Sequence, residues 1–489
     1  MEPVRMPRTL LASTAFAALA LTSPDSPAGA SGASGAQHDL VRSQVLAGDY
    51  AGLPDQDATP GPQFGHAIAV DDDWMAVGAP GTRVGAGAGE VRGAVFLFQR
   101  EGSQWQLRQR LPGFGSWGPA PRCGHSVTLR LPRLAFGCPG TEWPATPGQA
   151  SGAVVVSRLI DGVWASPAGY RQSGTDGACG HAVALTPTVA GHPVHLAVGC
   201  PGSAGDTGEV RVLSATDTGN AWAVTHTLLA AGAAPGNRFG QALALRRVIA
   251  FDLVGQTLAV GAPGRPQGAA AGAGAVHLFE GGGFAPTGLV LMPNAVLFPQ
   301  AGFGSAVAVT AGQLLVGAPG GPGGGSVCNT LPRCGSVYRY TSAGGTWQLA
   351  DGGEVVNQGG NPPGGQSGMA FGAALALGHD GWSAFAAPLA DGHTGTIPPG
   401  VAPEVGMVEL RRAAGGGFSA APADHRGELR PPPSALGGSG QTWFGTALAF
   451  TGDGLAVGYP RAGGLLGNRD GRVWMYRHDR LFADGFELP

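Results

Sequence analysis

Seven copies of one short signature run through this chain of 489 residues, and they limit its possible folds more than any other feature. Each copy has an aromatic residue or a cysteine followed by glycine, and 14 to 22 residues later it has Gly-Ala-Pro or a close variant. The copies begin at Phe64, Cys123, Cys179, Phe239, Phe303, Phe371 and Phe444. Repeats of about this size are typical of folds in which similar units pack side by side.

A third motif fixes the register of the copies. A Gly-x-Val triplet opens the next apolar run in every copy, and these triplets begin at Gly93, Gly152, Gly208, Gly274, Gly335, Gly406 and Gly471. Within 8 to 12 residues of the valine, six copies carry an aromatic residue: Trp105, Trp164, Trp222, Phe284, Trp347 and Phe418. Three motifs in one order, repeated seven times, indicate one structural unit per copy.

The segments between the motifs are short, apolar and bounded by Gly, Pro or Asp, which predicts four antiparallel strands per copy. The fold class is therefore all-β, a single seven-bladed β-propeller over residues 38–478, with an open solenoid as the competing arrangement. The last copy supplies only three clear strands. Residues 40–48 (LVRSQVLAG) resemble the fourth strand of the first copy, residues 105–113 (WQLRQRLPG). We predict that this N-terminal strand completes the seventh sheet and closes the ring.

These motifs resemble the FG-GAP repeat, which forms the propeller of integrin α subunits and of many bacterial exported proteins. Many members of that family hold calcium in an Asp-rich loop between the first two strands of a blade. Here most of these connections are too short to surround an ion: residues 71–73, 131–133, 311–313 and 452–454. We therefore expect neither a bound metal nor another cofactor. The last residues, 479–489, read as a short tail outside the repeats.

The composition agrees with a folded repeat protein that does not bind nucleic acid. The 88 Gly and 40 Pro would suggest low complexity without a period, but 43% of the residues are hydrophobic. The 29 Lys and Arg residues stand against 32 Asp and Glu, so no basic excess is available for phosphates. The chain contains no lysine at all, which rules out Schiff-base chemistry.

The first residues have the three parts of a secretory signal. Arg5 and Arg8 precede an apolar run over residues 9–22, and Ala28-Gly29-Ala30 supplies a small-residue cleavage site. We expect a signal peptide over residues 1–30, with cleavage as late as residue 36, and export to the periplasm or the exterior. No later segment has the length of apolar sequence that a transmembrane helix needs.

The six cysteines fit the repeat. In the second and third copies, the aromatic position and the alanine of Gly-Ala-Pro both become cysteine, and the two positions face each other across one hairpin. The predicted disulfides are therefore Cys123–Cys138 and Cys179–Cys200, and the remaining pair is Cys328–Cys334. Six cysteines allow fifteen connectivities, and the repeat favours this one.

Three histidines occupy one position of the repeat. His66, His125 and His181 follow the anchor glycine in adjacent copies, where the other copies have Gln241, Ser305, Ala373 and Thr446. If these positions face the axis of the ring, the histidines either form a three-His metal site or belong to a tolerant polar lining. We expect the lining.

Function is expected on the face of the ring that carries the long connections between strands two and three and between blades. Candidate ligand-facing residues there are Arg83, Arg92, Trp117, Arg122, Glu142 and Trp143. No catalytic constellation is recognisable, so the chain is predicted not to be an enzyme. By the resemblance, we expect a monomeric exported scaffold that binds a protein or a glycan at the cell surface. A propeller-based polysaccharide-active enzyme and a structural cell-envelope protein are the alternatives.

Overall fold

The computed structural model divides the chain into two units, Met1–Ala36 and Gln37–Pro489, and all residues described below belong to the second. The described residues are 40–51, 53, 61–84, 91–114, 117–118, 120–144, 146–165, 167–171, 176–250, 253–292, 299–310, 312–321, 334–343, 346–356, 369–378, 381–390, 406–412, 425–431, 443–461 and 471–478. Within this part of the chain, no helix has the length and apolar character needed to cross a membrane. The predicted signal segment, residues 1–30, and the tail, residues 479–489, lie outside the described residues.

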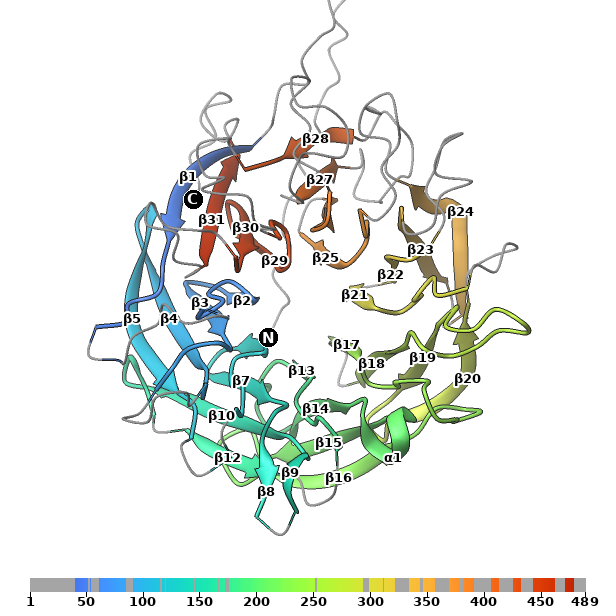
Figure 1. Cartoon of the computed structure of the whole chain (residues 1–489), viewed down its shortest axis with the longest axis horizontal. Coiled ribbons are helices and arrows are strands. Elements are labelled where there is room, and N and C mark those ends of the chain that lie inside the picture. The colour runs from blue at the N-terminus through green and yellow to red at the C-terminus, as the bar shows by residue number, and fades with distance from the viewer. Residues whose placement is uncertain are drawn as a thin grey trace, which may run out of the picture. The chain divides into compact units, whose positions relative to one another are not determined.

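Seven antiparallel sheets stand around one axis as the blades of a β-propeller (Figure 1), numbered here in the order of the sequence copies. Blade 1 contains β2 (Ala67–Asp71), β3 (Trp74–Ala79), β4 (Ala94–Glu101) and β5 (Gln104–Pro112). Blade 2 contains β6 (Ser126–Arg130), β7 (Arg133–Cys138), β10 (Ala153–Ile160), β11 (Val163–Trp164) and β12 (Ala168–Arg171). Blade 3 contains β13 (Ala182–Leu185), β14 (Val194–Cys200), β15 (Glu209–Ala215) and β16 (Ala223–Leu228).

The remaining four blades repeat this order from the axis outward. Blade 4 contains β17 (Ala242–Ala250), β18 (Leu253–Ala262), β19 (Ala275–Glu280) and β20 (Ala285–Leu291). Blade 5 contains β21 (Ala306–Thr310), β22 (Gln313–Ala318), β23 (Ser336–Ala343) and β24 (Thr346–Val356). Blade 6 contains β25 (Ala374–Leu377), β26 (Trp382–Ala387), β27 (Met407–Arg412) and β28 (His425–Leu429). Blade 7 contains β29 (Leu448–Thr451), β30 (Gly454–Tyr459), β31 (Arg472–His478) and β1 (Leu40–Leu46).

Strand β1 closes the ring, as the sequence predicts. It pairs antiparallel with β31, with Leu40 opposite His478 and Leu46 opposite Val473, and Figure 1 shows the first and last strands side by side. Its Gln44 side chain also reaches the outer strand of blade 1, donating to Trp105 O and accepting from Trp105 N, each at 2.9 Å. The N-terminal strand therefore fastens blade 7 to blade 1.

The three sequence motifs meet where one blade packs on the next. The anchor residue Cys123 forms a parallel bridge with Gly93 of the preceding blade, and five further bridges of this kind follow, including Phe64 with Gly471. Gly78, from Gly-Ala-Pro, lies against the carbonyl of Gly124, and a Cβ at Gly78 would clash with it. Glycine is required at both positions because backbone of adjacent blades comes into direct contact there.

Aromatic residues fill the space between blades at two radii. The anchor phenylalanines are fully buried, and Phe64 packs edge-on to Phe96 at 5.4 Å. The outer aromatics Trp105, Trp164, Trp222, Phe284 and Trp347 are also buried. Trp164 is held by Gln109 of blade 1 in the same two-bond manner as Trp105 by Gln44. Phe418 lies outside the described residues.

Two of the predicted disulfides are present. Cys123–Cys138 and Cys179–Cys200 join Cα atoms 4.0 and 3.9 Å apart, and all four residues are buried. Cys334 is buried and disulfide-bonded, but Cys328 lies outside the described residues, so their pairing stays a prediction.

Blade 2 and blade 3 contain elements that the sequence pattern did not predict. A separate hairpin of β8 (Glu142–Trp143) and β9 (Thr146–Ala150) forms within the connection over residues 140–151. The short helix α1 (Ser203–Asp206) follows β14. The outer strand of blade 2 is split into β11 and β12, which is explained by Pro167 because proline has no N–H for the ladder.

Candidate functional site

Seven β-turns surround the axis where the innermost strands begin. In each turn, the carbonyl of the residue before the anchor pair accepts a hydrogen bond from the N–H three residues later, as Arg122 does from His125 at 3.2 Å. The first and fourth residues of each turn therefore lie close together at this end of the axis. The pairs are Gln63 and His66, Arg122 and His125, Ala178 and His181, Arg238 and Gln241, Gly302 and Ser305, Ala370 and Ala373, and Trp443 and Thr446.

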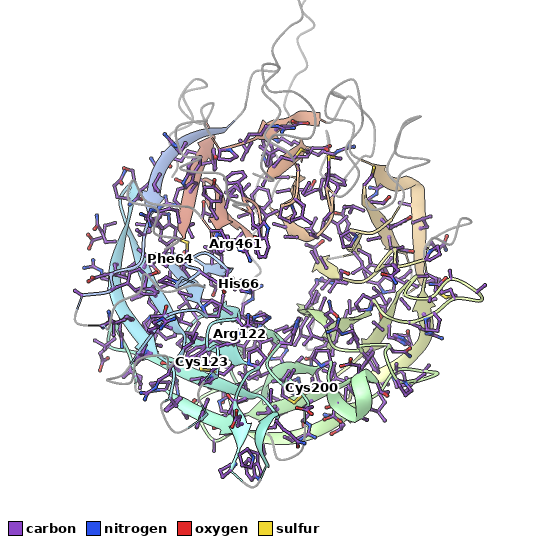
Figure 2. All side chains as sticks on the ribbon, viewed as in Figure 1. Phe64, His66, Arg122, Cys123, Cys200 and Arg461 are labelled. Atoms are coloured by element: carbon purple, nitrogen blue, oxygen red, sulfur yellow. A yellow bond between two sulfur atoms is a disulfide. The ribbon has the colours of Figure 1, made fainter. Side chains whose placement is uncertain are left out.

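This end of the axis belongs to the face that carries the connections between blades and between second and third strands, which we call the long-loop face. The opposite face, with the connections between first and second strands, is called the tight-turn face. Figure 2 places His66 and Arg122 beside the axis of the ring. We use the term axial site for Arg122, Arg238, Gln241 and the three histidines His66, His125 and His181.

The three histidines converge. The ring centroids of His66 and His125 are 4.8 Å apart, and those of His125 and His181 are also 4.8 Å apart. His181 Nδ1 lies 3.2 Å from the carbonyl oxygen of Gln241, so the row continues into blade 4. Equivalent positions on adjacent inner strands thus form a continuous row of imidazoles.

The surroundings keep these imidazoles neutral. Burial and then the positive charge of Arg122 lower the pKa of His66 to about 4. Burial, its two histidine neighbours and Arg122 hold the pKa of His125 well below its usual range. Burial also lowers the pKa of His181, with Arg238 and Arg122 acting in the same direction and the hydrogen bond to Gln241 opposing them. At neutral pH the row therefore consists of uncharged rings.

Two arginines stand at the exposed edge of the axial site. Arg122 and Arg238 occupy the same turn position two blades apart, with φ values of 56° and 55°, and Ala178 lies between them at that position. Both side chains belong to exposed residues, and neither guanidinium has a hydrogen-bond or ion-pair partner among the described residues. The sequence singled out Arg122 but not Arg238, although the repeat places both before an anchor residue.

Some polar groups in the axial site are buried without a partner. His125 Nδ1 and Gln241 Oε1 are inaccessible to solvent, and neither has a hydrogen-bond partner in the described part of the structure. Buried polar groups in native proteins normally have a partner, which can be another protein group, an ordered water, an ion or a bound molecule. In blade 7, next to blade 1, the Arg461 guanidinium lies 3.4 Å from the ring centroid of Trp443.

The donor atoms of the histidine row are not arranged as a metal site. Among the described residues, one group of His, Cys, Asp or Glu brings its donor atoms within 4.8 Å of one another, and it consists of Cys179, Cys200 and Glu209. The two sulfurs of this group are joined in a disulfide, so they offer no thiolate.

The other predicted ligand-facing residues belong to connections of blades 1 and 2, outside the axial site. Trp117 is 6% exposed, and its ring stacks on Phe114 at 4.4 Å. Glu142 and Trp143 form the half-buried strand β8. Arg83 and Arg92 are half-buried at the two ends of the connection between β3 and β4. Their role in binding stays a prediction.

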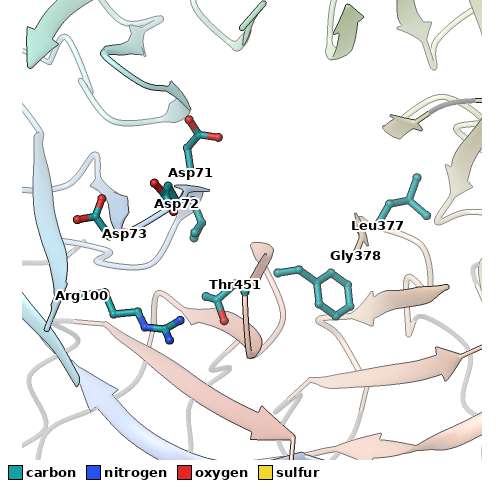
Figure 3. Close-up of a pocket in the computed structure, with 10 residues that line it drawn as sticks. Asp71, Asp72, Asp73, Arg100, Leu377, Gly378 and Thr451 are labelled. Atoms are coloured by element: carbon teal, nitrogen blue, oxygen red, sulfur yellow. The ribbon is translucent and has the colours of Figure 1, made fainter. Parts of the chain in front are cut away.

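A cavity of about 450 Å³ opens on the tight-turn face, between blades 1, 6 and 7 (Figure 3). Two of its charged side chains, Asp71 and Arg100, connect neighbouring blades. Asp71 accepts a hydrogen bond from Leu131 N of blade 2 at 2.7 Å, and Arg100 pairs with Asp453 of blade 7 at 3.0 Å. Asp73 accepts from Gln99 at 3.1 Å. These contacts give Asp71, Asp73 and Arg100 protein partners without a ligand, and Asp72 in the same lining is exposed.

The fold defines the class of the protein: it is a seven-bladed β-propeller whose ring is closed by its N-terminal strand. No protein-family model matches the chain, and no curated protein matches it.

Proposed function

We propose that this chain is an exported, non-catalytic β-propeller of the FG-GAP type that binds a protein or a glycan at the cell surface through its long-loop face. The observation that carries the proposal is the pair of arginines at the axial site that have no partner among the described residues. On the long-loop face, the exposed Arg122 and Arg238 have no partner among the described residues. On the tight-turn face, Arg133 donates to Thr216 O of the next blade at 2.8 Å, and Arg247 donates to Pro193 O at 2.6 Å.

Arg133 and Arg247 thus bind neighbouring blades, whereas Arg122 and Arg238 at the axial site are available to a ligand. Arginine side chains on a rigid scaffold are frequent binding anchors. The order of the three motifs supports an FG-GAP-type propeller, and the two buried disulfides support export because disulfides persist in oxidising compartments. The pocket acids Asp71 and Asp73 fasten the chain to itself, which argues against a polysaccharide-active site there.

The proposal is tested by binding of the purified chain to a glycan array and to solubilised cell-surface proteins. One variant replaces residues 143–149 of the β8–β9 hairpin by a Gly-Ser linker of equal length. The matched control changes Ile160 and Val163 to serine, because both are exposed on the tight-turn face of the same blade.

We expect the hairpin variant to lose most of the binding and the control to keep it. A control variant that loses binding together with the hairpin variant, or a wild-type chain that binds neither protein nor glycan, would contradict the proposal. Secretion is checked separately by fractionation of cells that express the full chain.

A further inference from the structure

We propose that the axial site binds an oxyanion, a carboxylate, sulfate or phosphate group, held between Arg122 and Arg238 and above the row of His66, His125 and His181. The inference names the ligand chemistry of the long-loop face, and it rests on the proposed function for the larger molecule that would carry this group.

Arg122 and Arg238 supply a pair of guanidinium groups at the axial site. Arg122 and Arg238 are exposed and unpaired among the described residues, and the intervening Ala178 leaves the position between them without a long side chain. Planar guanidinium groups match the geometry of carboxylate, sulfate and phosphate oxygens and can form two parallel hydrogen bonds. Both groups act on the same ring, that of His181, so they can reach one anionic group beside it.

The charge around the histidines is positive. The charged side chains that act on their protonation are Arg122 and Arg238, and both act as positive charges. The acids nearest in the fold are occupied or do not pair with these arginines. Glu209 pairs with Arg211 at 2.7 Å, and Asp176 accepts from Ala150 N at 3.1 Å.

Asp206 approaches Arg238 through the backbone alone, with its carbonyl accepting from Arg238 N at 2.7 Å. No ion pair joins the side chains of these two described residues. The field at the axial site is therefore positive, which attracts an anion and opposes a metal cation.

The axial site also contains a buried polar group without a partner among the described residues. His125 Nδ1 is enclosed and has no hydrogen-bond partner among the described residues. In the neutral ring, either nitrogen can carry the hydrogen, so this atom can donate to an anion oxygen as well as accept. A bound oxyanion would supply the missing partner and would favour protonation of the row, so binding should strengthen as the pH falls below neutrality.

The chain itself supplies substitutions that its backbone tolerates. Gln63 occupies the turn position of Arg122 and Arg238 in blade 1, with a φ of 59°. The double variant Arg122→Gln and Arg238→Gln should therefore fold. Its control is Arg108→Gln with Arg412→Gln, which makes the same change in net charge at two residues outside the axial site. For the histidine row, His125→Gln has Gln241 as its precedent in the repeat.

The experiment titrates each purified protein with sodium sulfate, sodium phosphate and sodium glucuronate by calorimetry, at constant ionic strength set with chloride, near pH 5.5 and near pH 7.5. Wild-type protein should bind at least one of these anions, and the double variant should bind it about tenfold or more weakly, since it lacks the charge-assisted hydrogen bonds of both guanidinium groups. Sulfate keeps its charge across this pH range, so its affinity should increase at the lower pH in wild type and less in His125→Gln.

The three anions also distinguish a carboxylate-bearing ligand from a sulfated or phosphorylated one. The inference is overturned if wild type binds none of them, or if the double variant binds as tightly as wild type and the control. Failure of the proposed function looks different. If the anion binds but no protein or glycan does, the oxyanion site is supported and the proposed binding function is contradicted. If a protein or glycan binds the double variant with the same affinity as wild type, the proposed function is supported and the anion-binding axial site is contradicted.

Discussion

The Cys123–Cys138 disulfide can be replaced by the phenylalanine and alanine that most other copies carry at these positions. This exchange tests whether equivalent positions of the repeat pack in the same way between blades. The perturbation is Cys123→Phe with Cys138→Ala, which restores the Phe-Gly and Gly-Ala-Pro motifs in blade 2. The reference is Cys123→Ala with Cys138→Ala, which removes the cross-link and puts nothing in its place. Both cysteines are fully buried, so either change acts on the contact between blades 1 and 2.

The expected magnitudes follow from burial and loop length. The disulfide joins residues 15 apart, and losing it should cost about 3 kcal/mol in free energy of unfolding. A buried phenylalanine returns about 1.5–3 kcal/mol. Blade 6 shows that the ring fits, because Phe371 packs edge-on to Phe385 at 5.9 Å, and Phe136 is the counterpart of Phe385 in blade 2. The exchange variant should therefore lie within about 1.5 kcal/mol of wild type.

The assay is equilibrium unfolding in guanidinium chloride, followed by fluorescence and circular dichroism so that departures from two-state behaviour are visible. Wild type and the exchange variant should have similar free energies of unfolding, and that of the double-alanine variant should be clearly lower. An exchange variant no more stable than the double-alanine variant would refute the reasoning, because position 123 would then not be equivalent to the anchor phenylalanines. The pair Cys179 and Cys200 provides an independent repetition in blade 3.

Three further predictions concern the latch, acid stability and calcium. Deleting residues 37–49 removes β1 and should destabilise the whole ring, whereas deleting residues 479–489 should leave the unfolding midpoint in denaturant unchanged; equal midpoints for the two deletions would argue against the latch. Because the pKa of His66 in the folded chain is about 4, below its ordinary value of 6.5, the unfolded chain takes up a proton first as the pH falls. The free energy of unfolding should therefore be highest above about pH 6.5 and decline toward pH 4. The slope of this free energy against pH reports the number of protons taken up on unfolding, and His66→Gln should lower that number by about one. Added calcium should not raise the thermal midpoint, and a rise of many degrees would show that the short connections bind the ion after all.

The ring could be predicted from the sequence because all of its constraints recur. The anchor glycine, the Gly-Ala-Pro glycine and the Gly-x-Val glycine are repeated since they meet at junctions between blades, as Gly124, Gly78 and Gly93 do; only the sixth copy has alanine, Ala386, at the Gly-Ala-Pro position. The N-terminal strand was recognisable because the fourth strand of blade 1 has a similar sequence. A physical requirement that is repeated seven times leaves a pattern that one sequence can show.

The axial site could be predicted only in part because its members break the repeat. The three histidines were visible as an unusual run at one position, but Arg122 and Arg238 share a position with Gln63, Ala178 and Trp443, so no pattern marks them. Their convergence depends on the seven turns facing one axis, which follows from the closed ring and not from local sequence. The β8–β9 hairpin was missed for a similar reason, since a two-residue strand is too short to show a period.

The two ends of the inner strands therefore have different physical roles, and this difference separates stability from binding. At the tight-turn end, Asp71 accepts from Leu131 N of the next blade, so Asp71→Ala leaves a backbone donor without its partner and should lower stability by about 1–3 kcal/mol. At the long-loop end, Arg122→Gln removes a side chain that no described residue contacts by hydrogen bond or ion pair, so stability should hardly change. A charged position whose loss leaves the fold intact has no structural reason to be charged. If Arg122→Gln proved as destabilising as Asp71→Ala, the charge at the axis would belong to the scaffold, and the argument for a ligand there would fail.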